Sequence, residues 1–93
     1  MLEFLNDAFN YEDRKVGRDK IGTLIVSTAL TSDEGYETAI LDAAGTHPVE
    51  RYGTREAADA GHKEWVKRAP TLTTITKLGW LDMVNAKKVT LVR

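Results

Sequence analysis

The stretch GTREAADAGHKEWVKRAP, residues 53–70, decides the fold, because its start, its buried face and its end can all be read from the sequence. Thr54 is a suitable helix N-cap, since its hydroxyl can accept a hydrogen bond from a free amide of the first turn. Pro70 cannot continue a helix, so the segment ends there. We therefore predict one main α-helix over residues 54–69.

One face of this helix is predicted to pack on the core. Ala58, His62 and Trp65 recur at three- and four-residue spacing, with Gly61 and Ala69 on the same stripe. A glycine inside a helix costs about 1 kcal/mol relative to alanine, and a close approach to an underlying strand would explain it. The opposite face pairs unlike charges four residues apart and is predicted to be solvated. The pattern predicts a helix lying on a sheet.

Three segments before the helix have the composition of β-strands. Residues 22–30 are rich in β-branched side chains, and residues 36–43 return after a turn that contains Gly35. Residues 47–52 follow a second turn, and Pro48 restricts this third strand to a sheet edge or to its own first residue. These segments predict an antiparallel β-meander that leads into the helix.

The two ends of the chain complete the predicted architecture. Residues 71–84 combine threonines, typical of extended chain, with an apolar spacing that also suits a helix, and residues 87–93 alternate like a last strand returning to the sheet. The sequence thus predicts an α+β fold in one domain. Its parts are a short helical arm at 1–10, the meander plus helix at 11–70, and a C-terminal segment at 71–93.

The totals exclude several classes of function. The 93 residues contain no cysteine, which excludes disulfides, thiol catalysis and thiolate metal sites. Thirteen basic and fourteen acidic residues are mixed along the chain, and even the basic run at 14–20 contains Asp19, so it is interpreted as a solvated strand or loop. We expect no nucleic-acid partner. No apolar stretch approaches the roughly 20 residues of a membrane span, and the acidic start is unlike a signal peptide, so we expect no membrane partner.

No group of residues predicts catalysis or a metal site. A catalytic His62 would need a carboxylate or a nucleophile, and its own helix stripe supplies neither. We interpret it as packed on Trp65 and bonded to a backbone carbonyl. His47 has no companion at metal-ligand spacing. The acids of one hairpin lack the spacing of a calcium loop and are expected to keep it soluble; they are Asp33, Glu34, Glu37 and Asp42. We expect no enzyme, no cofactor and no metal.

Two apolar segments are candidates for contacts with other proteins. The first is the face of the N-terminal helix, which is too short to be stable alone and either caps its own core or inserts into a neighbour; it comprises Leu2, Phe4, Leu5 and Phe9. The second follows Gly79 and is either a satellite of the core or an exposed interaction patch; it comprises Trp80, Leu81 and Met83.

Five short motifs in order along the chain carry a resemblance. They are YEDRKVGRD at 11–19, VST at 26–28, YETAI at 36–40, VERY at 49–52 and TREAADAGHKEWV at 54–66. Together they resemble small proteins of tailed-bacteriophage genomes that are often encoded among head and tail genes. The resemblance covers roughly residues 11–66 and brings no catalytic residue. It implies a protein made in the host bacterial cytoplasm, with the virion as one destination.

Two functions of different classes follow. The first is a non-enzymatic structural or assembly protein that binds a phage capsid, neck or tail protein, or a second copy of itself, through its apolar segments. The second is an accessory protein that binds a host factor or sequesters a signalling nucleotide. That alternative needs a pocket with a few polar groups, for which Arg51, Tyr52 and Arg55 are the candidates.

Overall fold

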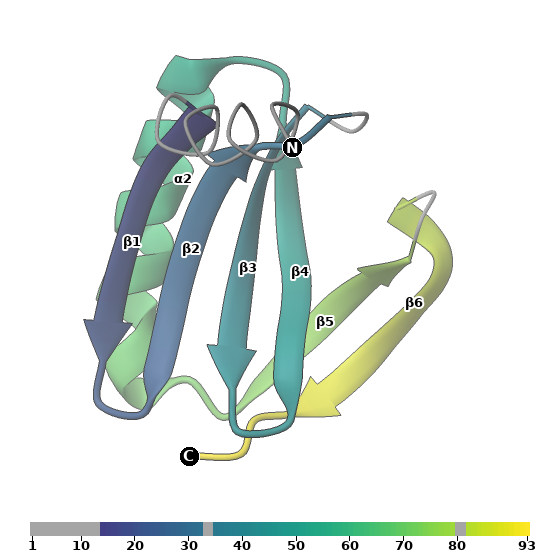
Figure 1. Cartoon of the computed structure of the whole chain (residues 1–93). Helices are drawn as coiled ribbons and strands as arrows, with labels where there is room; N and C mark the ends of the chain where they lie inside the picture. Colours follow the sequence, from purple (N-terminus) through teal and green to yellow (C-terminus); the bar gives the residue numbers. More distant parts are fainter. Residues whose placement is uncertain (1–13, 33–34, 80–81) are drawn as a thin grey trace, which may run out of the picture.

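A computed structural model describes residues 14–32, 35–79 and 82–93, with only the backbone considered at 82–85. Figure 1 shows the chain with its elements labelled. The elements in order are β1 (Lys15–Ile21), β2 (Leu24–Leu30), β3 (Tyr36–Asp42), β4 (Gly45–Tyr52), α2 (Arg55–Arg68), a 3-10 turn (Ala69–Thr71), β5 (Thr74–Gly79) and β6 (Asp82–Thr90). The helical arm predicted at 1–10 lies outside the described residues.

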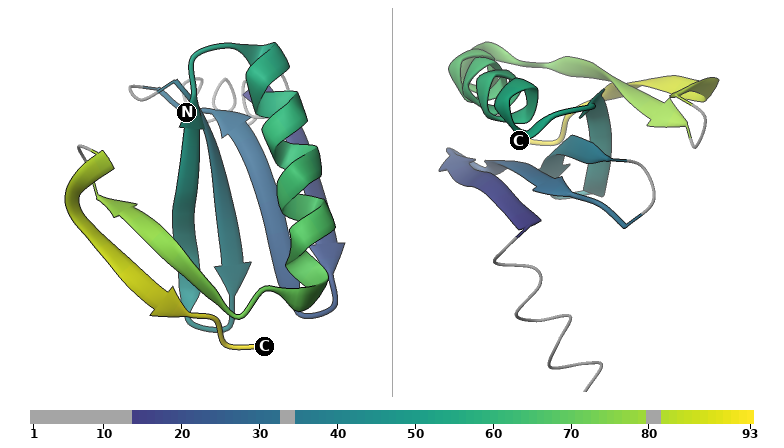
Figure 2. Two further views of the ribbon diagram at one scale, coloured as in Figure 1. Left: turned by 180° about the vertical axis from the view of Figure 1, so that it is seen from behind. Right: turned by 90° about the horizontal axis from the view of Figure 1, so that it is seen from above.

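The first four strands form one antiparallel sheet in the order β1-β2-β3-β4, and α2 covers one face of it (Figures 1 and 2). The three strands predicted from the sequence are confirmed, and the basic run at 14–20 supplies a fourth, β1. Gly22, with φ of 61°, forms the tight turn between β1 and β2. β4 lies at an edge of the sheet, which is one of the two arrangements predicted from Pro48.

The helix begins and packs as predicted. The Thr54 hydroxyl accepts a hydrogen bond from the Ala57 amide at 3.1 Å, and the predicted core residues Ala58, His62 and Trp65 are all buried. A side chain at Gly61 would collide with the ring of Tyr52 on β4, which confirms a close approach between helix and sheet. Tyr52 therefore occupies the space that any larger residue at this position would need.

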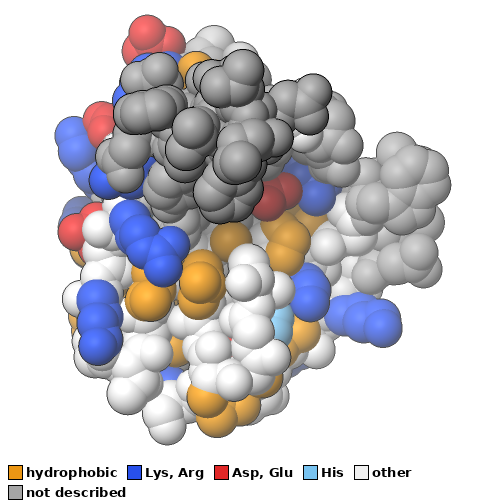
Figure 3. All heavy atoms as spheres, in the orientation of Figure 1, with side chains coloured by type: hydrophobic (Ala, Val, Ile, Leu, Met, Phe, Trp, Pro, Cys, Tyr) orange, Lys and Arg blue, Asp and Glu red, His pale blue; other side chains and the backbone are white. Residues whose placement is uncertain are grey.

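The other face of the sheet is turned toward the viewer in Figure 3, where hydrophobic and basic side chains are interspersed. Successive residues of a strand point to opposite faces. The residues on this face therefore alternate with the buried residues that face the helix. Ile25, Ala29 and Leu41 are only partly buried there. The fully buried aliphatic side chains, Leu24, Val26 and Ile40, lie on the helix side.

The C-terminal segment forms a second, two-stranded antiparallel sheet of β5 and β6. The prediction that the last strand returns to the main sheet is therefore wrong. The open edge of β4 carries Pro48, which lacks a donor, beside a shift in its register with β3, whereas β5 offers β6 an uninterrupted partner over most of its length. The segment 71–84 suited both helix and strand; within it, residues 74–79 lie in β5 and residues 82–84 in β6.

This hairpin still shares the core of the main sheet. Ile75 and Leu91 are buried in the same hydrophobic cluster as Trp65. The hairpin diverges from β4 in Figure 1 and lies on the same side of the main sheet as α2 in Figure 2. Sheet, helix and hairpin thus surround one core, and the hairpin leaves a groove beside α2.

Candidate functional site

A series of hydrogen-bonded polar side chains, called the polar chain below, crosses the layer between α2 and the sheet, starting at His62. Its Nε2 lies 2.7 Å from Asp19 Oδ2 on β1, and its Nδ1 lies 2.7 Å from Thr28 Oγ1 on β2. Thr28 Oγ1 is 2.5 Å from Thr38 Oγ1 on β3. The register of the sheet makes this possible, because Thr28 and Thr38 are direct cross-strand partners.

The polar chain continues to Tyr52 on β4 and ends at the carboxylate of Glu50. The Tyr52 hydroxyl lies 3.1 Å from Thr38 Oγ1 and donates to Glu50 Oε1 at 3.0 Å. Trp65 Nε1 donates to the same carboxylate oxygen at 2.8 Å. Burial raises the pKa of Tyr52 to about 12, with the neighbouring Glu50 adding to the rise. The phenol therefore keeps its proton and serves as a donor.

Counting donors gives the direction of every bond in this chain. Tyr52 donates to Glu50, so it accepts from Thr38, and Thr38 in turn accepts from Thr28. Thr28 has then used its single hydrogen and accepts from Nδ1 of His62. Nε2 faces Asp19, and an ionised carboxylate can only accept.

Thr28, His62 and Asp19 have the residue types of a nucleophile, a base and an orienting acid. The prediction that His62 bonds to a backbone carbonyl is wrong, because β1 and β2 bring it a carboxylate and a hydroxyl. Thr28 is nevertheless 0% exposed, so a substrate has no route to its hydroxyl. A nucleophile must reach the reacting atom. The contacts that the structure shows connect α2 to β1 and β2.

Glu50, the last member of the polar chain, lines a groove of about 460 Å³ between β4, the last turns of α2 and the β5–β6 hairpin. Trp65 and Arg68 of α2 form one side, with the Arg68 guanidinium carbon 4.2 Å from the Trp65 ring centre. Glu50 lies on the β4 side. The remaining lining residues are Val49, Thr74, Ile75, Thr76 and Lys88.

The cationic groups of this groove lack carboxylate partners. Within residues 14–32, 35–79 and 82–93, neither Arg68 nor Lys88 forms an ion pair. Arg68 is instead held by its stacking on Trp65, an arrangement that stabilises a guanidinium while leaving its edge available. Glu50 is fixed in place by Tyr52 and Trp65. The groove is therefore lined by two basic side chains that form no ion pair among the described residues and by the anchored carboxylate of Glu50.

The structure does not bring the predicted pocket residues together. Arg51 binds Glu37 Oε2 through Nε at 3.0 Å and the carbonyl of Gly79 at 3.1 Å, whereas Tyr52 belongs to the polar chain. Arg55 donates to the Lys15 carbonyl at 3.1 Å and ties the start of α2 to β1. These three side chains therefore act at three separate places.

The predicted interaction segments lie largely outside the described residues. This applies to the arm residues Leu2, Phe4, Leu5 and Phe9 and to Trp80 and Leu81. Met83 lies in β6, where only the backbone is described. The groove beside Trp65 and Arg68 was not anticipated from the sequence.

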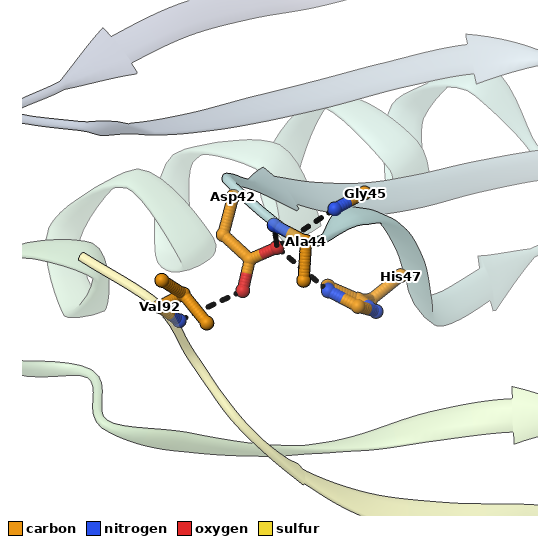
Figure 4. A network of polar contacts seen from close by, with 5 residues as sticks. All are labelled: Asp42, Ala44, Gly45, His47 and Val92. Atoms are coloured by element: carbon orange, nitrogen blue, oxygen red, sulfur yellow. Dashed lines mark hydrogen bonds and ion pairs between the residues drawn. The ribbon is translucent and has the colours of Figure 1, made fainter.

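Asp42, expected to keep a hairpin soluble, is instead the buried centre of a hydrogen-bond cluster (Figure 4). Its carboxylate accepts from the amides of Ala44 at 2.9 Å, Gly45 at 3.0 Å and Val92 at 2.8 Å, and it contacts His47 Nε2 at 2.9 Å. The hydrogen bond from Val92 is the main cause that lowers its pKa to about 2, against the opposing effect of burial. Asp42 thus joins the β3–β4 turn to the C-terminal segment.

His47 has one unusual nitrogen. Its Nδ1 is buried and has no hydrogen-bond partner in the part of the chain that the structure describes. Among those same residues, no three His, Asp or Glu side chains are placed to hold a metal ion together. Through its contacts with His47 and with the Val92 amide, Asp42 connects β4 to the C-terminal segment.

Comparison of the chain with protein-family models, with curated proteins and with solved structures found no match in any of the three. None of the helices that the structure describes has the length and apolarity to cross a membrane.

Proposed function

We propose that this chain is a non-enzymatic structural or assembly protein of a tailed phage that works through protein–protein contacts. The resemblance of its motifs supplies the phage context. The observation that carries the proposal is the groove, where a tryptophan and a stacked arginine lie beside two strand edges. Tryptophan and arginine are enriched among the residues that dominate binding energy at protein interfaces.

The two strands that flank the groove support this use. β4 ends the main sheet and β5 belongs to a different sheet. No backbone hydrogen bond joins them in the described part of the chain. Edges of this kind retain hydrogen-bonding groups that a partner chain can use. We propose a capsid, neck or tail protein, or a second copy of the chain, as the partner, met in the bacterial cytoplasm and retained in the virion.

The same groove gives the alternative function a specific observation. Arg68, Lys88 and Trp65 together offer positive charge beside an aromatic ring, which also suits a nucleotide, and about 460 Å³ falls in the range of small-molecule sites. Sequestration of a signalling nucleotide is therefore the second candidate. Calorimetric titration with mono-, di- and cyclic nucleotides separates the two functions, because only the alternative expects saturable heat.

The main proposal is tested in the phage that encodes the chain. Mass spectrometry of purified virions should find the protein at a copy number in keeping with a structural component. The double variant Arg68→Glu and Lys88→Glu should be folded but depleted from virions, whereas Lys20→Glu, on the exposed β1 edge, should be retained. Virions that lack the wild-type protein would contradict the proposal.

The N-terminal arm provides an independent test of the same proposal. Deletion of residues 1–10 should leave a folded domain if the arm serves assembly, and should lower the melting temperature sharply if the arm caps the core. If the truncated protein is fully stable and is still incorporated, the arm has neither role and the groove alone carries the contact.

A further inference from the structure

We infer that the groove receives an acidic segment of the protein partner, with its carboxylates on Arg68 and Lys88. This inference rests on the proposed function and adds the chemistry of the partner to it. Its starting point is the uneven distribution of charge between the hairpin and the rest of the fold.

The C-terminal segment is basic although the whole chain has a net charge of -1. Residues 71–93 contain one acid, Asp82, and four bases: Lys77, Lys87, Lys88 and Arg93. Arg93 is engaged with the carbonyls of Ala69 and Leu72. The three lysines have no such internal contacts among the described residues.

The placement of two lysines opposes the stability of the hairpin itself. Lys77 and Lys87 are direct cross-strand partners, and like charges at such positions are destabilising. Lys88, on the next residue of β6, pairs with the uncharged Thr76 and lines the groove. Because neighbouring residues of a strand point to opposite faces, Lys77 and Lys87 lie on the face away from Lys88. Of these three lysines only Lys88 lines the groove, and the other two add to the positive charge of the hairpin as a whole.

The two sides of the groove would orient that partner. Arg68 and Lys88 attract carboxylates, and the hydroxyls of Thr74 and Thr76 on the same hairpin can donate to them. Glu50 on the β4 side is held by Tyr52 and Trp65, so it cannot turn away from an approaching acid. An acidic segment therefore binds with its carboxylates toward Arg68 and Lys88 and away from Glu50.

The same features disfavour a nucleotide. Trp65 is only 8% exposed and its ring is covered by Arg68, so a free face for stacking a base is missing. The anchored Glu50 adds repulsion for a multiply charged phosphate.

The test uses two synthetic peptides that are identical except that the glutamates of one are glutamines in the other. Protein with Trp80→Phe retains Trp65 as its single tryptophan, so a change in emission reports the groove. The glutamate peptide should give a saturable change that weakens with salt. The glutamine peptide should bind at least roughly tenfold more weakly.

Variants assign the binding to the groove. Lys88→Gln, at an exposed position, and Arg68→Gln should each weaken the glutamate peptide, whereas Arg68→Lys should retain most of the affinity. Lys20→Gln is the matched control on β1 and should bind as the wild type does. Equal binding of the two peptides, or unchanged binding by Lys88→Gln and Arg68→Gln, would overturn the inference.

ATP is the competitor that represents the other anion class. If ATP binds to the Arg68 and Lys88 site more tightly than the glutamate peptide, the inference is wrong in favour of a nucleotide ligand. Failure of the inference is distinguishable from failure of the proposed function. If the peptides bind weakly but the Arg68→Glu and Lys88→Glu double variant is lost from virions, only the inference of an acidic partner is contradicted. If the wild-type protein is absent from virions, the proposed assembly role is contradicted.

Discussion

Polar residues are arranged differently in two regions: the layer between α2 and the main sheet, and the β5–β6 hairpin. In the layer, Asp19, His62 and Thr28 satisfy one another within hydrogen-bond distance. On the hairpin, Lys77 and Lys87 face each other without compensation. Internal pairing of polar groups specifies a unique packing, and uncompensated surface charge is available for association. The first region therefore helps to specify the fold, whereas under the proposed function the second is the part of the protein that contacts a partner.

The largest expected effect comes from Trp65→Ala, at the boundary between the two regions. Trp65 belongs to the shared core, holds Glu50 and supports Arg68. Its loss should lower the free energy of unfolding by about 3 to 5 kcal/mol, measured by urea denaturation. Lys63→Ala, on the solvated face of α2, is the control and should change it little. Equal losses in the two variants would contradict this assignment of the helix faces.

Thr28→Val breaks the polar chain without changing the size of the residue much. Thr38 and Nδ1 of His62 would each lose a partner in a buried site, which should cost about 1 to 3 kcal/mol. The neighbouring Ser27→Ala, on the other face of β2, is the matched control and should have a small effect. A Thr28→Val protein as stable as the wild type would mean that the chain contributes nothing to the fold.

Asp42 makes the attachment of the hairpin sensitive to acid. Its pKa is lowered from 3.8 to about 2 in the folded protein, so the ionised form stabilises the fold. That contribution is complete above about pH 4 and is lost as the pH falls through about 2. The stability advantage of the wild type over Asp42→Asn should therefore shrink in this window, measured by denaturation at a series of pH values. Exposed Asp59→Asn is the control; a constant difference for Asp42→Asn would refute the role.

The smallest effect is expected on the hairpin, and it has the opposite sign. Lys87→Glu replaces a repulsive cross-strand pair by an attractive one with Lys77, which should stabilise the protein by about 0.2 to 1 kcal/mol. The gain should diminish at high salt, as thermal melting would detect. If Lys87→Glu destabilises the protein, Lys87 has a structural role and the comparison of the two regions needs revision.

Local signals in the sequence predicted the central part of the fold. Thr54 and Pro70 mark the limits of α2, and the spacing of Ala58, His62 and Trp65 identifies its buried face. Each of these signals acts within a few residues, so one chain segment is sufficient to read it. The predicted strands are recognisable for the same reason.

The polar chain could not be predicted in this way. His62 meets Asp19 and Thr28 across 43 and 34 residues of sequence, and their meeting depends on the register of β1 and β2. The groove depends on how far β5 diverges from β4, which no short pattern specifies. One error was avoidable: Arg51 and Tyr52 are adjacent on a strand and must point to opposite faces, so they could not line one pocket.

The contact of Gly61 with Tyr52 has a consequence for how the sequence can diverge. A side chain at Gly61 would overlap the Tyr52 ring, and one at Gly17 would overlap the His62 ring. Any homologue that acquires a larger residue at either glycine should therefore carry a smaller side chain at the opposing ring position. Substitutions at these two pairs of sites should appear together in evolution, and a double exchange in the laboratory should recover stability that either single exchange loses.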